Sequence, residues 1–473
     1  MKNFFDDFKP IRNILRGLNL WKVLDELYWT QNKKRQNILP EVIEFIYLNS
    51  IVYSLEYNNI RIKDKQNKWD KIVIQSNVLL NKVNALWIEQ KGPWSYLQKG
   101  GLNQLKSGTD DYFSHIYRYY YIFSKEPINA HIESKIGMAY KDFLICAMWL
   151  HSIFTTKGYF IPKSYFLQNK FNGTVFSIEN VTRVLDILSI PYEKMKSTLK
   201  IELKYDINTF ITHDYIHLKK PIFEKQDILY CLFGGNLLDQ FTSGVYYLAE
   251  IYDNKYDLGN AFGGAFEDYV GLILDKNKNS DKFRIVKEIV YNNTEGEHKT
   301  SDWIIETENA IIFIECKTTR LLIESKKVED IHKSDKDKIA KAVVQIYKCY
   351  SEYINNVIPN LKYDPNKTLI PIVLTLEEWY GGTPDFKDEI ISIVKSKLKE
   401  KNFDYNLVDI YKYSHMSISN FETDIQIMAN IGFKDFFERN SNNKDEFNYR
   451  PYFQEEFEQI FIKPLENQNS EQG

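Results

Sequence analysis

The sequence predicts an α/β fold in two parts, a mostly α-helical N-terminal domain followed by a mixed sheet. Up to about residue 240, apolar residues recur mainly at helical spacing. After about residue 255, short Ile- and Val-rich runs alternate with helical segments in the order helix, three strands, helix, strand, which indicates an α/β layer. The 473 residues suffice for two or three domains. We expect boundaries at 1–240, 241–415 and 416–473.

The N-terminal part contains several segments with an amphipathic or apolar helical pattern. A further segment, 207–233, is richer in β-branched and aromatic residues and predicts either two strands or a helix–strand mixture. The expected helices cover 23–29, 39–55, 77–90, 140–154 and 178–190.

The second part carries the strands. Its most apolar run, "AIIFIECK", follows "SDWIIE" after a short turn at Thr307–Asn309, so the two predict a hairpin. The other expected elements are a helix at 260–276, a strand at 282–291, a polar loop at 292–300, a helix at 336–357, a strand at 368–377, a helix at 381–401 and an edge strand at 403–413.

The charge balance excludes a general attraction to nucleic acid. The formal net charge is −3, so binding DNA or RNA requires a local basic cleft. Residues 421–473 hold 11 Asp and Glu against 5 Lys and Arg, a net of −6, which argues against the C-terminal extension as that surface.

Cysteine use and hydropathy indicate the compartment. The four cysteines include no CxxC pair, which excludes a zinc ribbon and a disulfide framework, and free thiols suit a reducing cytoplasm. The N-terminus has acidic residues where a signal peptide needs an apolar run. No segment is apolar enough to cross a bilayer. We expect a cytoplasmic protein with no membrane partner.

Charged residues close the apolar run at 310–317. Alternate strand residues share a face, so Glu315 and Lys317 point to one side and Cys316 to the other. In a hairpin, the start of the first strand lies beside the end of the second, which places Asp302 next to Glu315. Two carboxylates and a lysine therefore meet at one corner of the sheet.

This grouping suits a divalent cation. Adjacent buried carboxylates repel each other unless a cation is present, and Mg²⁺, or Mn²⁺, prefers carboxylate and carbonyl oxygens. The Cys316 carbonyl offers a further oxygen. Lys317 could then orient or deprotonate a water, or stabilise charge on a phosphate. The alternative is an ordinary surface ion pair, because "ExK" alone is common.

Glu267, on the helix before the first strand, is a candidate third carboxylate. Its helical neighbours are Gly263, Gly264, Val270, Gly271 and Leu274, a strip that suits close packing against the sheet. A boundary Glu on an amphipathic helix is an equally good interpretation of this residue alone.

The four residues resemble the PD-(D/E)XK, or restriction-endonuclease-like, nuclease superfamily over roughly 255–380. The element order is also similar to that family's αβββαβ core. The resemblance implies that Asp302 and Glu315 bind the metal, that Lys317 serves catalysis and that Glu267 completes the site. It also places Gln345, on the following helix, near the site, although a boundary Gln explains it equally well. "SD" stands where the motif often has Pro-Asp.

The resemblance implies a Mg²⁺-dependent nuclease, with DNA as the expected substrate and bacterial restriction or anti-phage defence as the role by analogy. The N-terminal half would recognise the substrate or a protein partner, or form a homo-oligomer. The alternative is a nuclease-like fold that serves as a DNA-binding or assembly module with little cleavage of its own.

Three other features have weaker implications. Lysines at 332–341, with Lys326 and Lys327, would contact phosphates or form a solvated loop, and the loop is favoured. His213 and His217 have zinc-like spacing, but structural histidines are favoured. The aromatic run 112–123 is favoured as core rather than as a base-stacking surface.

Overall fold

The structure is a computed structural model of the chain. It describes residues 4–33, 38–57, 65–91, 112–171, 173–207, 215–252, 258–278, 282–293, 296–318, 333–379, 384–438 and 453–463.

Helices dominate the first 252 residues, and each helix expected there is present. The helix of the fifth expected segment shows the pattern, because it buries Val181, Val184, Leu185 and Leu188, which recur at helical spacing. The helices are α1 (Phe5–Leu15), α2 (Leu20–Lys33), α3 (Pro40–Tyr53), α4 (Lys65–Lys91), α6 (Tyr112–Phe123), α7 (Ile128–Ile136), α8 (Tyr140–Lys157), α9 (Ile178–Leu188), α10 (Tyr192–Glu202), α12 (Ile216–Lys219), α13 (Gly234–Phe241) and α14 (Val245–Leu248).

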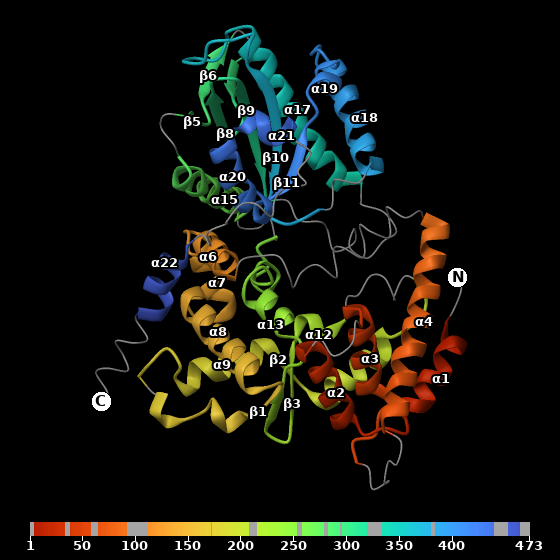
Figure 1. Cartoon of the computed structure of the whole chain (residues 1–473). Helices are drawn as coiled ribbons and strands as arrows, with labels where there is room; N and C mark the ends of the chain where they lie inside the picture. The colour runs from red at the N-terminus through yellow and green to blue at the C-terminus, as the bar shows by residue number, and fades with distance from the viewer. Residues whose placement is uncertain are drawn as a thin grey trace.

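A small sheet lies among these helices, in the order β1–β4–β3–β2 (Figure 1). Its strands are β1 (Phe160–Pro162), β2 (Ser189–Pro191), β3 (Ile222–Lys225) and β4 (Ile228–Tyr230), with 3-10 turns at Lys163–Tyr165 and Asn169–Phe171. The segment 207–233 is thus a helix–strand mixture over its described residues, as one of the two predictions had it.

A five-stranded mixed sheet forms the second part of the chain, in the order β11–β10–β9–β8–β5. The pairs β5–β8 and β8–β9 are antiparallel, whereas β9–β10 and β10–β11 are parallel. The predicted α/β class with a mixed sheet is therefore confirmed. The strands are β5 (Phe283–Lys287), β8 (Trp303–Thr307), β9 (Ala310–Lys317), β10 (Thr368–Thr375) and β11 (Ser414–Ser417).

Helices cover both faces of this sheet (Figure 1). Ile312 and Ile314 of β9 belong to the apolar cluster that includes α15 (Leu258–Lys276) and α20 (Ile418–Ile431). Ile311 and Phe313 belong to the cluster of α17 (Lys333–Ile354) and α18 (Pro384–Glu400) on the other face. Since both faces are covered, β9 is apolar along its length until its last residues.

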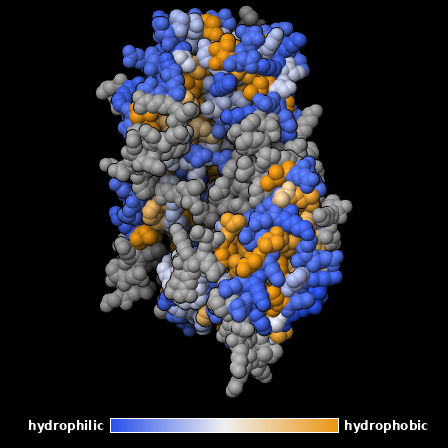
Figure 2. All heavy atoms as spheres, turned by 45° about the vertical axis from the view of Figure 1, so that its right-hand side comes forward, coloured by the Kyte–Doolittle hydropathy of each residue, from blue (hydrophilic) through white to orange (hydrophobic). Residues whose placement is uncertain are grey.

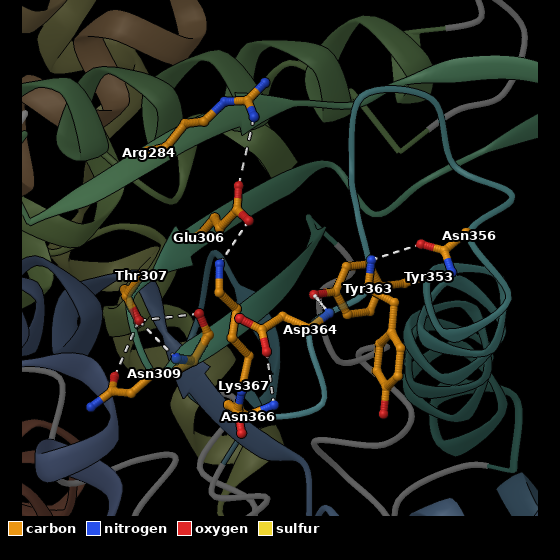
Figure 3. Close-up of polar contacts among 11 residues, drawn as sticks. Arg284, Glu306, Thr307, Asn309, Tyr353, Asn356, Tyr363, Asp364, Asn366 and Lys367 are labelled. Carbon is orange, nitrogen blue, oxygen red and sulfur yellow. Dashed lines mark hydrogen bonds and ion pairs between the residues drawn. The ribbon is translucent and has the colours of Figure 1, made fainter.

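Polar contacts fix the end of the sheet where β8 turns into β9 (Figure 3). Thr307 Oγ1 accepts the amide of Ala310 at 2.9 Å and closes the turn. Glu306 accepts from Lys367 at 2.8 Å, and Arg284 lies 3.6 Å from its other oxygen, so β5, β8 and the start of β10 are tied together. This anchored end is opposite to the end at which Glu315 and Lys317 lie.

One apolar cluster runs from the N-terminal helices into the sheet. It joins α6 and α8 to α15, the sheet and α20. At its centre, Arg118 of α6 donates two hydrogen bonds to Glu422 of α20, at 2.9 and 2.6 Å, and Tyr269 of α15 donates a third at 2.8 Å. Arg118 and Glu422 are 2% and 5% exposed, so this is a buried ion pair between the two parts of the chain. The division at residue 240 stays a prediction.

The last described segments pack back onto the body. They are α21 (Phe433–Glu438), α22 (Gln454–Phe457) and a π-helical turn, Glu458–Ile462. Phe457 lies edge-on to Phe113 of α6, with ring centroids 5.0 Å apart. The aromatic run 112–123 is accordingly a helix with Ile116, Tyr117 and Tyr119 buried, as the core interpretation predicted.

Three details of the second part differ from prediction. The expected strand 282–291 is broken at Glu288 and Ile289, giving β5 and then β6 (Val290–Asn293). Part of the expected polar loop is β7 (Gly296–Lys299), which pairs with β6 as a separate hairpin. The edge strand expected at 403–413 is wrong, since α19 (Leu407–Ile410) lies there and the edge strand is β11, just after it.

Among the described residues, none of the helices has the length and apolar character needed to cross a membrane.

Hydrophobic side chains gather at the lower right of the face shown in Figure 2. Exposed apolar side chains of the N-terminal half include Ile74 and Val78 of α4, at 60% and 61% exposure.

Candidate active site

Three chain segments meet at the free end of the five-stranded sheet: the end of β5, the residues before β8 and the end of β9. Trp303 pairs with Ile314, so Asp302 falls beside Glu315. The backbone N–H of Glu288 donates to the Asp302 carbonyl oxygen at 2.8 Å, which brings the end of β5 to the same place. The hairpin register therefore brings Asp302 to the "ECK" end of β9, as predicted.

Asp302 is held by the backbone of the neighbouring strand. Its Oδ2 accepts the amide N–H of Cys316 at 2.6 Å, and the residue is only 9% exposed. Burial raises the pKa of Asp302, while the charge of Lys317 and the Cys316 hydrogen bond oppose the rise. The carboxyl is thus fixed in place but incompletely neutralised.

Glu315 is the most deeply buried acidic group of the site, at 1% exposure. Its Oε1 accepts from Lys317 Nζ at 2.6 Å. Its Oε2 is buried, and the described residues provide it with no hydrogen-bond partner. Burial raises the pKa of Glu315 to about 8, with Lys317 lowering it and Asp302 and Glu267 raising it further. One ammonium therefore does not compensate for the burial of this carboxylate.

Lys317 shares the site with these carboxylates. Burial lowers its pKa, but the charge and hydrogen bond of Glu315, and the charge of Asp302, outweigh burial, so the net shift is upward. Lys317 is therefore an ammonium at neutral pH in this state. Its side chain is 28% exposed, so it lies at the rim of the site, where a substrate can reach it.

Glu267 approaches the same corner from α15. It is half-buried, and burial, followed by the charges of Asp302 and Glu288, raises its pKa. The Trp303 Nε1–H donates to the Glu267 carbonyl oxygen at 3.1 Å, which ties this turn of the helix to β8. The structure thus brings the three predicted carboxylates and Lys317 within electrostatic reach of one another.

The glycine strip beside Glu267 has one position of close approach. A Cβ added at Gly271 would lie 2.4 Å from Cζ2 of Trp303, so only glycine lets the indole sit against the helix. A Cβ at Gly264 would meet nothing within 4 Å, and one at Gly263 would meet only Glu267 Oε1, at 4.0 Å. The expected packing against the sheet is therefore confirmed at Gly271 and not at the other two glycines.

Two further predicted residues lie around this corner. The Cys316 side chain is buried in the apolar cluster on the α15 side, so only its backbone could serve a cation. Gln345 is half-buried on α17, one turn before Cys349, and the charge of Glu315 reaches the Cys349 thiol. Gln345 thus lies on a helix that borders the site. The role predicted for it stays a prediction.

The donor atoms fit a hard divalent cation, with Glu315 Oε2 as the observation that favours one. A buried anionic oxygen without a donor is costly, and a cation between Asp302 and Glu315 would satisfy it. Within the described residues, no group of three or more His, Cys, Asp or Glu side chains is placed to hold a metal. The side-chain ligands here would number two, with backbone oxygen and water completing the shell.

The sequence prediction missed three charged residues at this end of the sheet. Lys287 ends β5, Glu288 follows it, and Lys299 ends β7. Lys287 pairs with Asp268 of α15 at 3.0 Å, and Lys299 pairs with Glu288 at 3.1 Å. For Lys287 and Glu288 the signal in the sequence was the same as for Glu315, namely charged residues that close an apolar run.

The weaker candidates do not join this site. The described lysines at 333–341 lie on α17, where Lys336, only 9% exposed, pairs with Glu389, and Lys338 pairs with the buried Asp335, so the favoured interpretation as a solvated loop is wrong here. Lys326 and Lys327 lie outside the described residues, as does His213. His217 is buried, with Nε2 2.8 Å from Glu44 Oε1, which favours the structural role.

Comparison of the chain with protein-family models, with curated proteins and with solved structures found no match in any of the three. The residues of the site therefore carry the functional argument by themselves.

Proposed function

We propose that the protein is a Mg²⁺-dependent nuclease that hydrolyses phosphodiester bonds, with DNA as the substrate. The observation that carries the proposal is the unpartnered Oε2 of Glu315, a buried carboxylate oxygen beside Asp302 and a lysine. A bound cation would stabilise a carboxylate oxygen in that position. The roles of Asp302, Glu267 and Lys317 in hydrolysis follow from what each side chain can do beside a cation bound there.

Asp302 and Glu315 would hold the cation, and Glu267 would assist from α15. When bound, the metal lowers the pKa of a water and neutralises charge on the phosphate. The amide of Cys316 fixes Asp302 in position, so the ligand geometry rests on two paired strands rather than on a loop.

Lys317 has two candidate roles, activation of water and stabilisation of charge on the phosphate. The carboxylates around it raise its pKa, so in the resting state it carries its proton and cannot accept another. This favours binding of a phosphate oxygen as its first role. To act as a base it would first have to lose the proton that Glu315 helps to retain.

The wider biological role is part of the proposal by analogy. Nucleases with accessory domains suit bacterial restriction or anti-phage defence, in the cytoplasm, with the N-terminal half recognising substrate or a protein partner. The runner-up is a nuclease-like fold that binds DNA or assembles with protein and cleaves little. The small number of side-chain ligands favours this binding-module alternative. Only two carboxylates are placed to hold the cation among the described residues, and a third would hold it more tightly.

Plasmid cleavage in MgCl₂ tests the proposal. Wild type should nick or linearise the plasmid, and Glu315→Gln and Lys317→Ala should each lower the rate by at least about a hundredfold. Glu306→Gln, at the opposite end of the sheet, is the matched control and should cleave like wild type. Activity that survives both site substitutions would rule out this mechanism. A wild-type protein that binds DNA without cutting it would support the runner-up.

A further inference from the structure

Two lysines outside the predicted set flank the carboxylates. Lys287 is the last residue of β5, and Lys299 is the last residue of β7, three positions before Asp302. The backbone N–H of Glu288 donates a hydrogen bond to the Asp302 carbonyl oxygen at 2.8 Å. This bond holds the end of β5 against the residues that follow β7. Both lysines therefore lie at the edge of the sheet where the carboxylates gather.

The two lysines point to the same face of the strands. Lys287 pairs with Asp268 of α15, and its Nζ lies 5.8 Å from the centre of the Trp303 ring. Lys299 follows His298, whose Nδ1 is 2.7 Å from Glu352 of α17, and because adjacent strand residues point to opposite faces, Lys299 points away from α17. Both ammonium groups therefore lie on the α15 side of the sheet edge.

Both ammonium groups can be reached from solvent. The side chains of Lys287 and Lys299 are 59% and 53% exposed, against 28% for Lys317. Their partners are single carboxylates at 3.0 and 3.1 Å. Exposed ion pairs of this kind contribute little to stability, so a phosphate oxygen can replace the carboxylate at small cost.

The surrounding charge keeps both lysines protonated. The hydrogen bond of Asp268 raises the pKa of Lys287, and that of Glu288 raises the pKa of Lys299, with the charge of Glu267 contributing to each. Both cations therefore lie within the electrostatic reach of a candidate metal-binding carboxylate. A polyanion drawn to one of them is brought to the site itself.

The chain as a whole is slightly acidic, at −3, so local cations must hold a polyanionic substrate. We propose that Lys287 and Lys299 bind backbone phosphates of a nucleic-acid strand, next to the phosphate that faces Asp302 and Glu315. This inference rests on the proposed nuclease function, because it assigns the two lysines to binding of that enzyme's substrate. The binding of DNA can nevertheless be measured whether or not the protein cleaves it. It makes these lysines substrate-binding residues that read charge and not base sequence.

Binding of a short fluorescein-labelled DNA duplex, followed by anisotropy in MgCl₂, tests the contacts. A Glu315→Gln background prevents cleavage during the titration. Adding Lys287→Gln and Lys299→Gln should weaken binding on the order of tenfold for each lysine near 0.1 M salt, and should lower the slope of log K against log salt by about 0.9 for each. Lys287→Arg with Lys299→Arg should restore the slope, because the charge is kept.

The matched control replaces two ion-paired lysines elsewhere, of which Lys9 is exposed and Lys395 is half-buried. Lys9 pairs with Asp6 on α1 at 2.6 Å, and Lys395 pairs with Asp409 at 2.7 Å. Lys9→Gln with Lys395→Gln changes the net charge equally, so it should leave the salt slope within error of the background protein. Equal slopes for the test and control pairs would overturn the proposal, as would a background protein that does not bind the duplex.

Cleavage by otherwise wild-type protein separates this inference from the proposed function. The double Lys→Gln variant should raise KM by at least tenfold while kcat stays within about threefold, since the reacting groups are intact. Lysine-dependent binding without any wild-type cleavage would remove the nuclease proposal and leave the phosphate contacts standing. Wild-type cleavage together with an unchanged KM in the double variant would remove the phosphate contacts and leave the nuclease proposal standing.

Discussion

The indole of Trp303 lies directly against Gly271, and its Nε1–H donates to the carbonyl oxygen of Glu267 at 3.1 Å. This contact sets the distance between α15, which carries Glu267, and the strand that follows Asp302. The helix and the sheet thus hold their carboxylates in a fixed relation through one aromatic side chain and one missing Cβ.

Gly271→Ala should disturb this relation. The new Cβ would lie 2.4 Å from the indole, so the ring or the helix must shift, at a cost of about 1–3 kcal/mol for overpacking. Gly264→Ala is the matched control on the same helix, where the Cβ meets nothing within 4 Å and should gain up to about 1 kcal/mol of helix propensity. Urea unfolding of both variants measures the difference. Equal stabilities would mean that the contact is not as tight as described.

Metal binding should raise the stability of wild type selectively. Because Glu315 Oε2 is buried without a donor, we expect Mg²⁺ to raise the Tm of wild type and to leave that of Glu315→Gln unchanged. In EDTA above about pH 8 the order should reverse, with Glu315→Gln at least as stable as wild type, since a buried charge has been removed. Differential scanning calorimetry with and without MgCl₂ checks both statements. A Glu306→Gln control that loses the Mg²⁺ response would point to binding elsewhere.

The same group predicts a pH dependence in EDTA. The pKa of Glu315 is about 8 in the folded protein and near the ordinary 4.5 in the unfolded chain, so the folded state holds an extra proton between these values. The contribution of Glu315 to stability is therefore fully present below about pH 4.5 and is lost as the pH rises through about 8. Replacement by Gln should remove this decline, which chemical denaturation at a series of pH values would measure.

His415 predicts the opposite slope in acid. Burial, followed by the charge of Lys387, lowers the pKa of this histidine to about 4, from 6.5. The unfolded chain then binds a proton that the folded protein does not, so stability falls as the pH drops from about 6.5 to 4. His415→Gln should reduce that slope by up to about 1.4 kcal/mol per pH unit. His415 shares a register row with Glu315, since both pair with Val373 of β10, so the measurement is made in EDTA.

The buried pair of Arg118 and Glu422 should be strongly coupled. Glu422→Gln removes the carboxylate charge that accepts two hydrogen bonds from the guanidinium, and removing one partner of a buried pair costs about 3–5 kcal/mol. Replacing both residues by Met should cost much less than the two single changes together. A double-mutant cycle in urea gives the coupling, and additive single effects would contradict the buried ion pair.

The local parts of the fold were predictable from sequence, and the edges were not. The β8–β9 hairpin followed from apolar alternation around the turn at Thr307–Asn309, and its register alone placed Asp302 beside Glu315. β7 and β11 were missed because "GEHK" and "SHMS" are short and mainly polar, so they carry no alternation to read. Their pairing depends on neighbours that are distant in sequence.

The site was predictable to a similar degree. Asp302, Glu315 and Lys317 lie within one hairpin, so their meeting is a local property of the sequence. Glu267 required its helix to pack on the sheet, and the glycine spacing was an indirect sign of that packing. Lys287 and Lys299 were missed, because their approach depends on the break at Glu288 that separates β5 from β6.

The core that runs from α6 and α8 into α15 and the sheet also limits how this chain can evolve. A domain that is exchanged between proteins by recombination needs a boundary across which few contacts are lost. Here a cut near residue 240 would strip the apolar cover from α15 and leave Glu422 without Arg118. The helical half and the site-bearing half would therefore be inherited together, and any change of target would arise by substitution on the existing surface and not by exchange of the first half.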